Sequence, residues 1–389
     1  MKIVDQKLFV ANVARTNLVF VKLYTDDGIE GVGEATLEWK TETVVGALAE
    51  LKRYLIGKDP FQVDLHIETM HRDSYWRDGA VFRSALGAVE AAMLDIKGKA
   101  LGVPVYELLG GRQRDAVACY GNHWFFGAVT PEDHARLARV AVDQGLKALK
   151  WDPLGSASLD LSRAQRMTAV EIVEAVRAEV GEDIDLMLDF HGRLNVPSSI
   201  AIARDLERFN LRWIEEPTPP DSIDALADVR RNSRVPIAAG ERYYVPDRFM
   251  EAIAKNAVDV LQPDVCHCGG MAAAKWVAGL AHNRMIPVAP HNPTGPVMNA
   301  MTLHLSLAIP NFTIFEMVMI DAPWRREIVR ESIIFRDGTI LAPTAPGLGV
   351  EIDEDACGRF PYQPTDVPLF DGSMNVRGIA SGNAVLGGA

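Results

Sequence analysis

The amino-acid sequence predicts an α/β protein: a (β/α)8 barrel of the TIM type, or a variant with one helix lost, preceded by an α+β domain. Three observations lead to this fold class. Short apolar runs alternate with helical stretches from residue 117 onward, ionisable residues follow successive runs, and the residues before 117 read as strands and then helices. We expect an N-terminal domain at residues 1–116, a barrel at 117–325, and a C-terminal segment at 326–389 that packs back on the first domain.

The N-terminal domain is expected to begin with strands over residues 1–45. Residues 19–24 are rich in β-formers, and the turn Asp26-Asp27-Gly28 leads into residues 29–34, which indicates a hairpin. Helices are then expected at residues 43–56, 60–74 and 80–101. The last of these is apolar on nearly all sides, so we expect it to be buried.

The barrel strands are expected at eight apolar runs: residues 117–120, 148–152, 186–190, 213–215, 237–239, 260–262, 288–289 and 314–315. Helices between them include residues 131–144, 164–179, 198–208 and 246–255. An open doubly wound sheet is the alternative, but eight units and the lack of a GxGxxG turn after a strand favour the barrel. After about residue 325 the chain is rich in Pro and Gly and is expected to form loops, ending in a frayed tail at residues 381–389.

Composition narrows the class of protein. The sequence is 48% hydrophobic and 24% charged, so it can bury a large core, and its net charge of −12 argues against nucleic acid or an anionic membrane as partner. It has four cysteines without a CxxC pair, no stretch of about 18 apolar residues, and no signal-peptide pattern at its N-terminus. These features predict a reduced, cytoplasmic protein that does not enter a membrane.

Three acidic residues lie at the ends of consecutive predicted strands. Asp189, Glu215 and Glu241 follow one another by one strand–helix unit each, which places them on the C-terminal rim where barrel active sites lie. Each alone is equally well a solvated residue or a salt-bridge partner. Together they would repel one another unless a cation neutralises them, and an all-oxygen set suits Mg²⁺.

Further ionisable residues extend this rim. Asp264 and His291 end neighbouring strands, so the acid is placed to fix the imidazole tautomer and leave the other ring nitrogen as a base. His191 follows Asp189 by two residues, which makes an acid/base pair with His291 across the cluster. The alternative for each histidine is a purely structural role, in which the ring is hydrogen-bonded.

Lys150 is expected to bind a substrate carboxylate, line the metal site or pair with an acid. Glu316 is expected to donate to the same carboxylate if protonated, or to pair with Lys150. His267 lies between Cys266 and Cys268, but three adjacent residues rarely converge on one metal, so we discount a metal site there.

The chain resembles the enolase superfamily, in its mandelate racemase branch, and most closely the galactonate dehydratase-like acid sugar dehydratases. The motifs that carry the resemblance span nearly the whole chain and are specific as an ordered set. They are GVGE at residues 31–34, DIKGK at 95–99, PVYELLGG at 104–111, KWDP at 150–153, DFHGR at 189–193, WIEEP at 213–217, GER at 240–242, QPD at 262–264 and PHNPTGP at 290–296.

The resemblance implies a (β/α)7β barrel with an N-terminal α+β capping domain and a closed homo-oligomer. It also implies Asp189, Glu215 and Glu241 as metal ligands, and residues with catalytic roles at Lys150, His191, Asp264, His291 and Glu316. The racemases and cycloisomerases of the branch usually carry Lys-x-Lys on strand two. Asp152 stands at the second position here, and His191 fills the opposing role, which favours a dehydratase.

The resemblance further implies an aldonate-type acid sugar as substrate. His291 would remove the proton at C2 to give a metal-stabilised enediolate, and His191 would protonate the departing 3-hydroxyl to give a 2-keto-3-deoxy acid. The two histidines exchange roles for a substrate of opposite C2 configuration. A racemase, epimerase or cycloisomerase that uses the same enediolate remains an alternative, as does a sugar-acid-binding barrel without catalysis.

Substrate choice is expected to lie with loops over the barrel mouth. On the N-terminal domain the candidates are Arg15, Thr16, Asn17, Trp39, Lys40, Trp76 and Arg77. On the barrel side they are Asn122, His123, Trp124, Asp152, Arg193, Tyr243 and Pro293. The stretch at residues 74–79 departs from the galactonate dehydratase pattern, which leaves the particular sugar open.

Overall fold

The computed structural model describes residues 1–14, 16–319, 324–331 and 333–364. An N-terminal sheet runs in the order β1 (Ile3–Asn12), β2 (Asn17–Thr25) and β3 (Glu30–Glu34), all antiparallel. The predicted hairpin is β2–β3. The expectation of strands up to residue 45 is wrong at its end, because α1 (Thr41–Leu55) begins earlier.

Helices cover this sheet. After α1 come α2 (Val63–Arg72), α3 (Ala80–Leu101) and the short α4 (Val105–Leu108), and α3 is buried as expected. Two glycines of β3 allow the close packing: a Cβ on Gly31 or Gly33 would lie 2.1 or 1.9 Å from a backbone oxygen of α3. The GVGE motif is therefore a requirement of sheet–helix contact.

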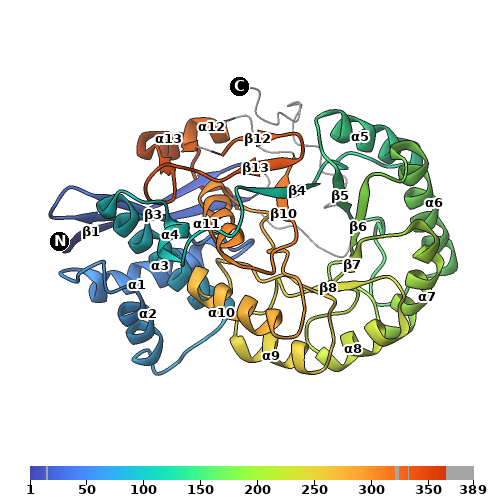
Figure 1. The fold of residues 1–389 in the computed structure, drawn as a ribbon, viewed down its shortest axis with the longest axis horizontal. Helices are drawn as coiled ribbons and strands as arrows, with labels where there is room; N and C mark the ends of the chain where they lie inside the picture. The colour runs from blue at the N-terminus through green and yellow to red at the C-terminus, as the bar shows by residue number, and fades with distance from the viewer. Residues whose placement is uncertain (15, 320–323, 332, 365–389) are drawn as a thin grey trace.

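The barrel strands follow in sequence order around a parallel sheet (Figure 1). They are β4 (Ala116–Asn122), β5 (Ala148–Trp151), β6 (Asp185–Asp189), β7 (Trp213–Glu215), β8 (Ile237–Ala239), β9 (Val260–Leu261) and β10 (Phe315–Val318), and β10 pairs with β4. The helices are α5 (Pro131–Asp143), α6 (Arg163–Val180), α7 (Val196–Leu206), the 3-10 turn η1 (Glu207–Phe209), α8 (Ile223–Asn232), α9 (Pro246–Ala254), α10 (Met271–His282) and α11 (Pro296–Ala308). The predicted fold class, a modified (β/α)8 barrel after an α+β domain, is confirmed.

The seventh predicted strand is reduced to isolated bridges. Val288 pairs with Leu261 on one side and Phe312 on the other, and no named strand forms there in the described chain. Pro287 and Pro290 flank the run and have no N–H to donate, so the ladder cannot extend.

Side chains fill the barrel interior. One separate apolar cluster takes a residue from each strand position: Tyr120, Ala148, Met187, Trp213, Ala238, Val260, Ala289 and Ile314. The main hydrophobic core lies outside the strands, against the helices, and includes the α3 side of the N-terminal domain. The inner layer makes the barrel a packed scaffold, so its upper rim is rigidly placed.

The C-terminal segment contains more structure than the loops expected. It forms α12 (Arg325–Ile328), β11 (Val329–Glu331), β12 (Phe335–Arg336), β13 (Thr339–Leu341), β14 (Val350–Ile352) and α13 (Glu354–Arg359). β13 pairs antiparallel with β4 of the barrel, whereas α13 packs on β1 and Glu354 pairs with Lys22 at 2.6 Å. The segment therefore contacts both parts of the chain. The tail predicted at residues 381–389 lies outside the described residues.

No helix in the described parts of the chain is long and apolar enough to cross a membrane. The four cysteines are buried free thiols.

Two barrel helices begin on carboxylates from the N-terminal domain. Helices α5 and α6 start on side-chain caps of their own, but the N-cap positions of α10 and α11 are Gly270 and Gly295, which have none. Glu90 accepts from the Met271 and Ala272 amides at 2.5 and 3.0 Å, and Glu34 accepts from the Met298 amide at 2.9 Å. These bonds satisfy amides that a helix start leaves unpaired, and they join the two parts of the protein.

Replacing Gly295 with Ala is expected to weaken this junction. Its φ of −108° suits any residue, but the new Cβ would lie 2.1 Å from Glu34 Oε1. We expect the free energy of unfolding to fall by about 1–3 kcal/mol from overpacking, measured by thermal unfolding.

Gly46→Ala is the matched control. Gly46 lies inside α1 and a Cβ there meets nothing within 4 Å, so the same change is expected to stabilise by about 0.5–1 kcal/mol. An equal response of both variants would contradict a specific contact at Glu34.

Candidate active site

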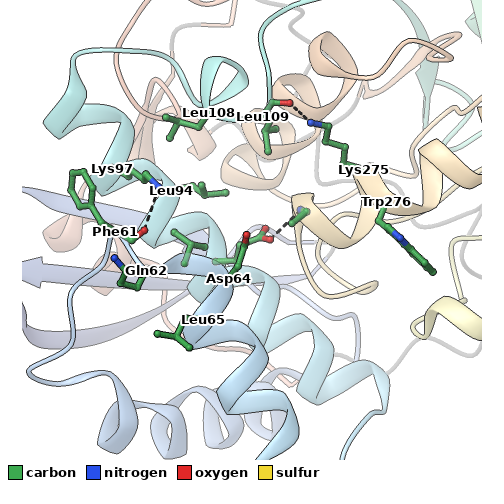
Figure 2. Close-up of a pocket in the computed structure, with 13 residues that line it drawn as sticks. Phe61, Gln62, Asp64, Leu65, Leu94, Lys97, Leu108, Leu109, Lys275 and Trp276 are labelled. Atoms are coloured by element: carbon green, nitrogen blue, oxygen red, sulfur yellow. Dashed lines mark hydrogen bonds between the residues drawn. The ribbon is translucent and has the colours of Figure 1, made fainter.

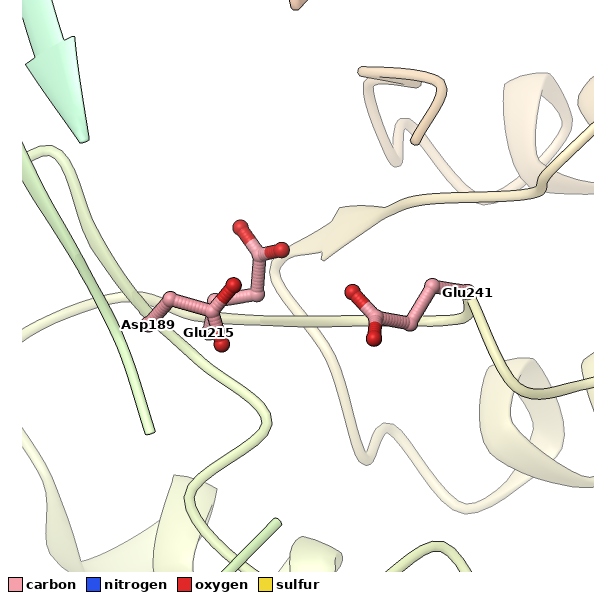
Figure 3. Close-up of side chains that lie close together, drawn as sticks. All are labelled: Asp189, Glu215 and Glu241. Carbon is pink, nitrogen blue, oxygen red and sulfur yellow. The ribbon is translucent and has the colours of Figure 1, made fainter. Parts of the chain in front are cut away.

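Three carboxylates meet at the C-terminal rim of the barrel. Asp189 and Glu215 are the last residues of β6 and β7 and are register partners, and Glu241 follows β8 by two residues. One oxygen of each lies within 4.8 Å of the others, and Figure 3 shows Glu241 facing the other two. The spacing expected from the sequence thus brings these acids together.

Lys150 at the end of β5 lies among these acids. Its side chain is 1% exposed, and its Nζ lies 2.5 Å from Glu215, 3.1 Å from Glu316 and 3.3 Å from Asp189. Burial opposes its charge, but Glu215 and Glu316 raise the pKa of Lys150 well above its ordinary value. Of the alternatives open for Lys150, pairing with acids is what the structure shows.

One lysine does not balance the cluster. Burial, reinforced by the Asp189 charge, raises the pKa of Glu215 to about 8. Burial and then Glu216 raise the pKa of Glu241 to about 7. The cluster therefore has a high affinity for positive charge, either a proton or a cation.

Glu316 on β10 is held as an ionised carboxylate. Burial alone would raise its pKa, but Lys150, His291 and amide donors hold the pKa below its ordinary value. Its Oε1 accepts from Asn122 Nδ2 at 2.7 Å and its Oε2 accepts from the Asn292 amide at 2.8 Å. The pairing alternative for Glu316 is therefore the one observed, and Asn122 orients it.

His291 approaches the cluster from the Glu241 side. Its Nδ1 lies 2.7 Å from Asp264 Oδ2, and its Nε2 lies 3.6 Å from Glu241 Oε2. Asp264 is fully buried, and its Oδ1 accepts from the Cys266 and His267 amides at 2.8 and 2.9 Å. Burial would lower the pKa of His291, but Glu241 and Asp264 raise it well above its ordinary value.

His191 approaches from the Asp189 side. Its Nε2 lies 3.5 Å from Asp189 Oδ2, and its Nδ1 lies 3.0 Å from Asp152 Oδ2. The residue has a φ of 49°, a left-handed backbone that is uncommon outside glycine, and its own amide donates to Asp189 Oδ1 at 2.9 Å. Burial opposes its charge, but Asp189 and Asp152 raise the pKa of His191 to about 9.

Several contacts in the site were not expected from the sequence. Trp213 Nε1 and Gln262 Nε2 donate to Glu215 Oε2 at 3.0 and 2.7 Å. His267 Nδ1 lies 2.9 Å from Ser84 on α3 and its Nε2 lies 3.5 Å from Asp264, which links the N-terminal domain to the acid. Of these contacts, the sequence pointed only to that of Gln262, through its motif position just before Pro263 and Asp264.

The barrel residues predicted to contact substrate lie in several surroundings. Trp124 is buried against Trp151, and Tyr243 is buried against Phe249 of α9. His123 stacks on Phe126. Asp152 and Arg193, also expected to contact substrate, pair with each other. A substrate role for Trp124, Tyr243 and His123 stays a prediction.

The N-terminal candidates are mostly exposed. Trp76 is 87% exposed and stacks edge-on with Tyr75, Lys40 and Arg77 are exposed, and Trp39 is about half exposed. Thr16 is buried, and Asn17 bonds to Asn12 and to the Gln363 carbonyl. Arg15 lies outside the described residues. These roles also stay predictions.

A groove of about 600 Å³ lies elsewhere, among α2, α3, α4 and α10 (Figure 2). The residues that line it include none of those predicted for the site. Its two lysines already donate to backbone carbonyls, Lys97 to Phe61 and Lys275 to Leu109. Its Glu90 caps α10 as described above, and the other acid that lines it is Asp64 of α2.

Comparisons with known families match both parts of the chain. The model of the mandelate racemase/muconate lactonizing enzyme N-terminal domain matches residues 3–110. The model described as enolase C-terminal domain-like matches residues 133–356, more than half of the chain.

Curated relatives match most of the chain. A D-galactonate dehydratase from Verminephrobacter eiseniae is 37% identical over 343 residues, which is 86% of this chain and 89% of the relative. A D-gluconate dehydratase from Thermoproteus tenax is 32% identical over 354 residues, which is 90% of this chain and 71% of the relative.

Solved structures agree. A mandelate racemase/muconate lactonizing enzyme-like protein from Rubrobacter xylanophilus superposes with a TM-score of 0.86 at 35% identity, covering 95% of this chain and 99% of that one. A member of the enolase superfamily from Salmonella Typhimurium gives a TM-score of 0.88 at 29% identity, covering 92% of this chain and 98% of that one. With a matching fold, matches to both domain models and relatives along most of the chain, the protein belongs to the enolase superfamily, in its mandelate racemase branch, among the galactonate dehydratase-like members.

Proposed function

We propose that this protein is a Mg²⁺-dependent acid sugar dehydratase, a hydro-lyase that converts an aldonate-type acid to a 2-keto-3-deoxy acid. The observation that carries the proposal is the placement of two histidines on opposite sides of a carboxylate cluster. His191 Nε2 lies beside Asp189 and His291 Nε2 beside Glu241, at 3.5 and 3.6 Å. An elimination needs both a base and an acid at the substrate, and this site offers one on each side.

The carboxylate cluster fits a divalent cation, which members of this superfamily bind. Asp189, Glu215 and Glu241 offer only oxygen ligands, lie within 4.8 Å of one another, and have raised proton affinity at two of the three positions. Hard oxygen donors and room for further oxygen ligands favour Mg²⁺. When bound, the ion would stabilise negative charge that develops on the substrate carboxylate.

The protein's own residues divide the remaining work. In its neutral form His291, oriented by Asp264, takes the proton from C2, and the electron pair of that C–H bond becomes part of the new double bond. His191 gives a proton to the 3-hydroxyl, the C3–O bond breaks and water leaves. The enol product then becomes the ketone. Lys150 and Glu316 set the charge around the carboxylate end of the site.

The relatives favour this reaction over other uses of the same geometry. They are named for dehydration of D-galactonate and D-gluconate, which are six-carbon aldonates. The two opposed histidines also suit proton transfer between the faces of C2, so a racemase or epimerase is the second candidate. We further propose a cytoplasmic location and a homo-oligomer, as the sequence and its resemblance imply.

A screen of mono- and diacid sugars with Mg²⁺ is expected to give an α-keto acid that semicarbazide detects. His291→Asn and His191→Asn are each expected to lower turnover by about 10²–10⁴-fold, because each removes a proton-transfer group. Inversion at C2 without keto acid would show a racemase instead. Binding with neither C2 exchange in D₂O nor product would show a sugar-acid-binding barrel.

Mg²⁺ binding is expected to release protons near neutral pH. Glu215 and Glu241 have pKa values of about 8 and 7, and the ion binds only their ionised forms. Calorimetry in two buffers of different ionisation enthalpy should find net proton release at pH 6.5. Glu241→Gln should reduce the release, and a release near zero at pH 6.5 in the unmodified protein would contradict the assignment.

The same shifts set the pH dependence of stability. Carboxyls whose pKa values exceed the ordinary 4.5 make the metal-free fold less stable as the pH rises from about 4.5 to 8. Bound Mg²⁺ removes this loss. The rise in thermal unfolding midpoint on adding Mg²⁺ should therefore be larger at pH 8 than at pH 5.

A further inference from the structure

Asp152 directs its carboxylate into the protein. Its Oδ1 accepts from the Leu154 amide at 2.8 Å, and its Oδ2 meets both His191 Nδ1, at 3.0 Å, and Arg193 Nη2. The residue is 3% exposed. Each oxygen of this carboxylate thus already has a donor in the protein.

The guanidinium of Arg193 likewise bonds to groups of the protein itself. Its side chain is 1% exposed, its Nη1 donates to the Gly155 carbonyl at 2.7 Å, and its Nε donates to the Phe190 carbonyl at 3.3 Å. The guanidinium fork therefore holds Asp152 through Nη2, while its other nitrogens bond to the loops that follow β5 and β6.

This arrangement repeats the pair on the opposite side of the cluster. Asp152 and Asp264 each bind the amide two residues later through Oδ1, and each turns Oδ2 toward Nδ1 of a histidine from the next strand position. Each histidine then places Nε2 beside one acid of the cluster, His191 by Asp189 and His291 by Glu241.

We propose that Asp152 and Arg193 are positioning residues that make His191 the imidazole of a second Asp–His pair, and that neither binds the acid sugar. The proposal rests on the dehydratase function. Because Asp152 accepts from Nδ1–H, the ring keeps the tautomer and the orientation in which Nε2 faces the cluster. His191 then acts on the departing hydroxyl, whereas His291 acts on C2 without help from this pair.

The test is Asp152→Asn, assayed in D₂O with the acid sugar that the wild-type protein turns over fastest in the screen. An amide donates where the carboxylate accepted, so His191 loses its fixed tautomer. We expect kcat for keto acid to fall about 10–100-fold, the size typical of removing such a partner, while KM changes less than about 2-fold. Deuterium should accumulate at C2 of the unreacted sugar, because His291 still removes the proton while elimination is slow.

Three comparisons sharpen the result. Arg193→Lys keeps the charge but loses the fork, and should show the same pattern at smaller size. Asp264→Asn should lose C2 exchange together with product. Asp185→Asn removes an Asp–Arg pair at the other end of β6, with Arg212 at 2.5 Å, and should leave both kcat and KM unchanged.

Several outcomes would overturn the inference. If KM rises by about 10-fold or more while kcat is retained, Asp152 is a substrate ligand, and unchanged kinetics would give it no role. If folded Asp152→Asn loses both C2 exchange and product formation, the two histidines do not have the separate roles proposed for them. Failure of both Asp152→Asn and Arg193→Lys to fold, by circular dichroism, would make the pair purely structural. If the wild-type protein forms no keto acid from any sugar, it is the dehydratase proposal that fails.

Discussion

The buried ammonium of Lys150 is the interaction on which the barrel rim depends. It lies within 3.3 Å of Asp189, Glu215 and Glu316, in surroundings from which water is largely excluded. Carboxylates this close in a low-dielectric interior cannot all ionise without a counter-charge. Lys150 supplies one charge, which fixes Glu316 as an anion and leaves the rest of the cluster short of positive charge. The affinity of the site for positive charge therefore follows from an imbalance that the fold itself builds in.

The two histidines of the proposed reaction lie against the same cluster. Each imidazole has its Nδ1 bonded to an aspartate and its Nε2 turned toward one acid of the cluster. Strand ends and their first loop residues carry all these groups, above an interior that side chains fill. Groups held on such a scaffold need little reorganisation when charge moves between them, which is the condition for efficient proton transfer.

Much of this was readable from the sequence because a barrel converts periodicity into position. One strand–helix unit separates Asp189, Glu215 and Glu241, so their meeting follows from counting. Side-chain direction after a strand ends does not follow from counting. Tyr243 lies two residues past Glu241, yet it packs outward on Phe249 because the backbone turns there. The partners of Asp152 likewise depend on loop conformation, including a left-handed His191, which residue identity does not dictate. The seventh predicted strand is reduced to bridges because Pro287 and Pro290 beside it have no N–H to donate.

The carboxylates of Glu34 and Glu90 have a consequence for how this protein can evolve. Two helices of the barrel start on side chains that another part of the chain supplies, opposite glycines that leave room for them. The two parts are thus separate in architecture and joined in their polar chemistry. A recombination event that exchanged the N-terminal part between distant relatives would leave helix ends bare or carboxylates without partners. Each acid must therefore be inherited together with the glycine opposite it. We expect substrate range to diversify through loop changes within one lineage more readily than through exchange of a whole domain.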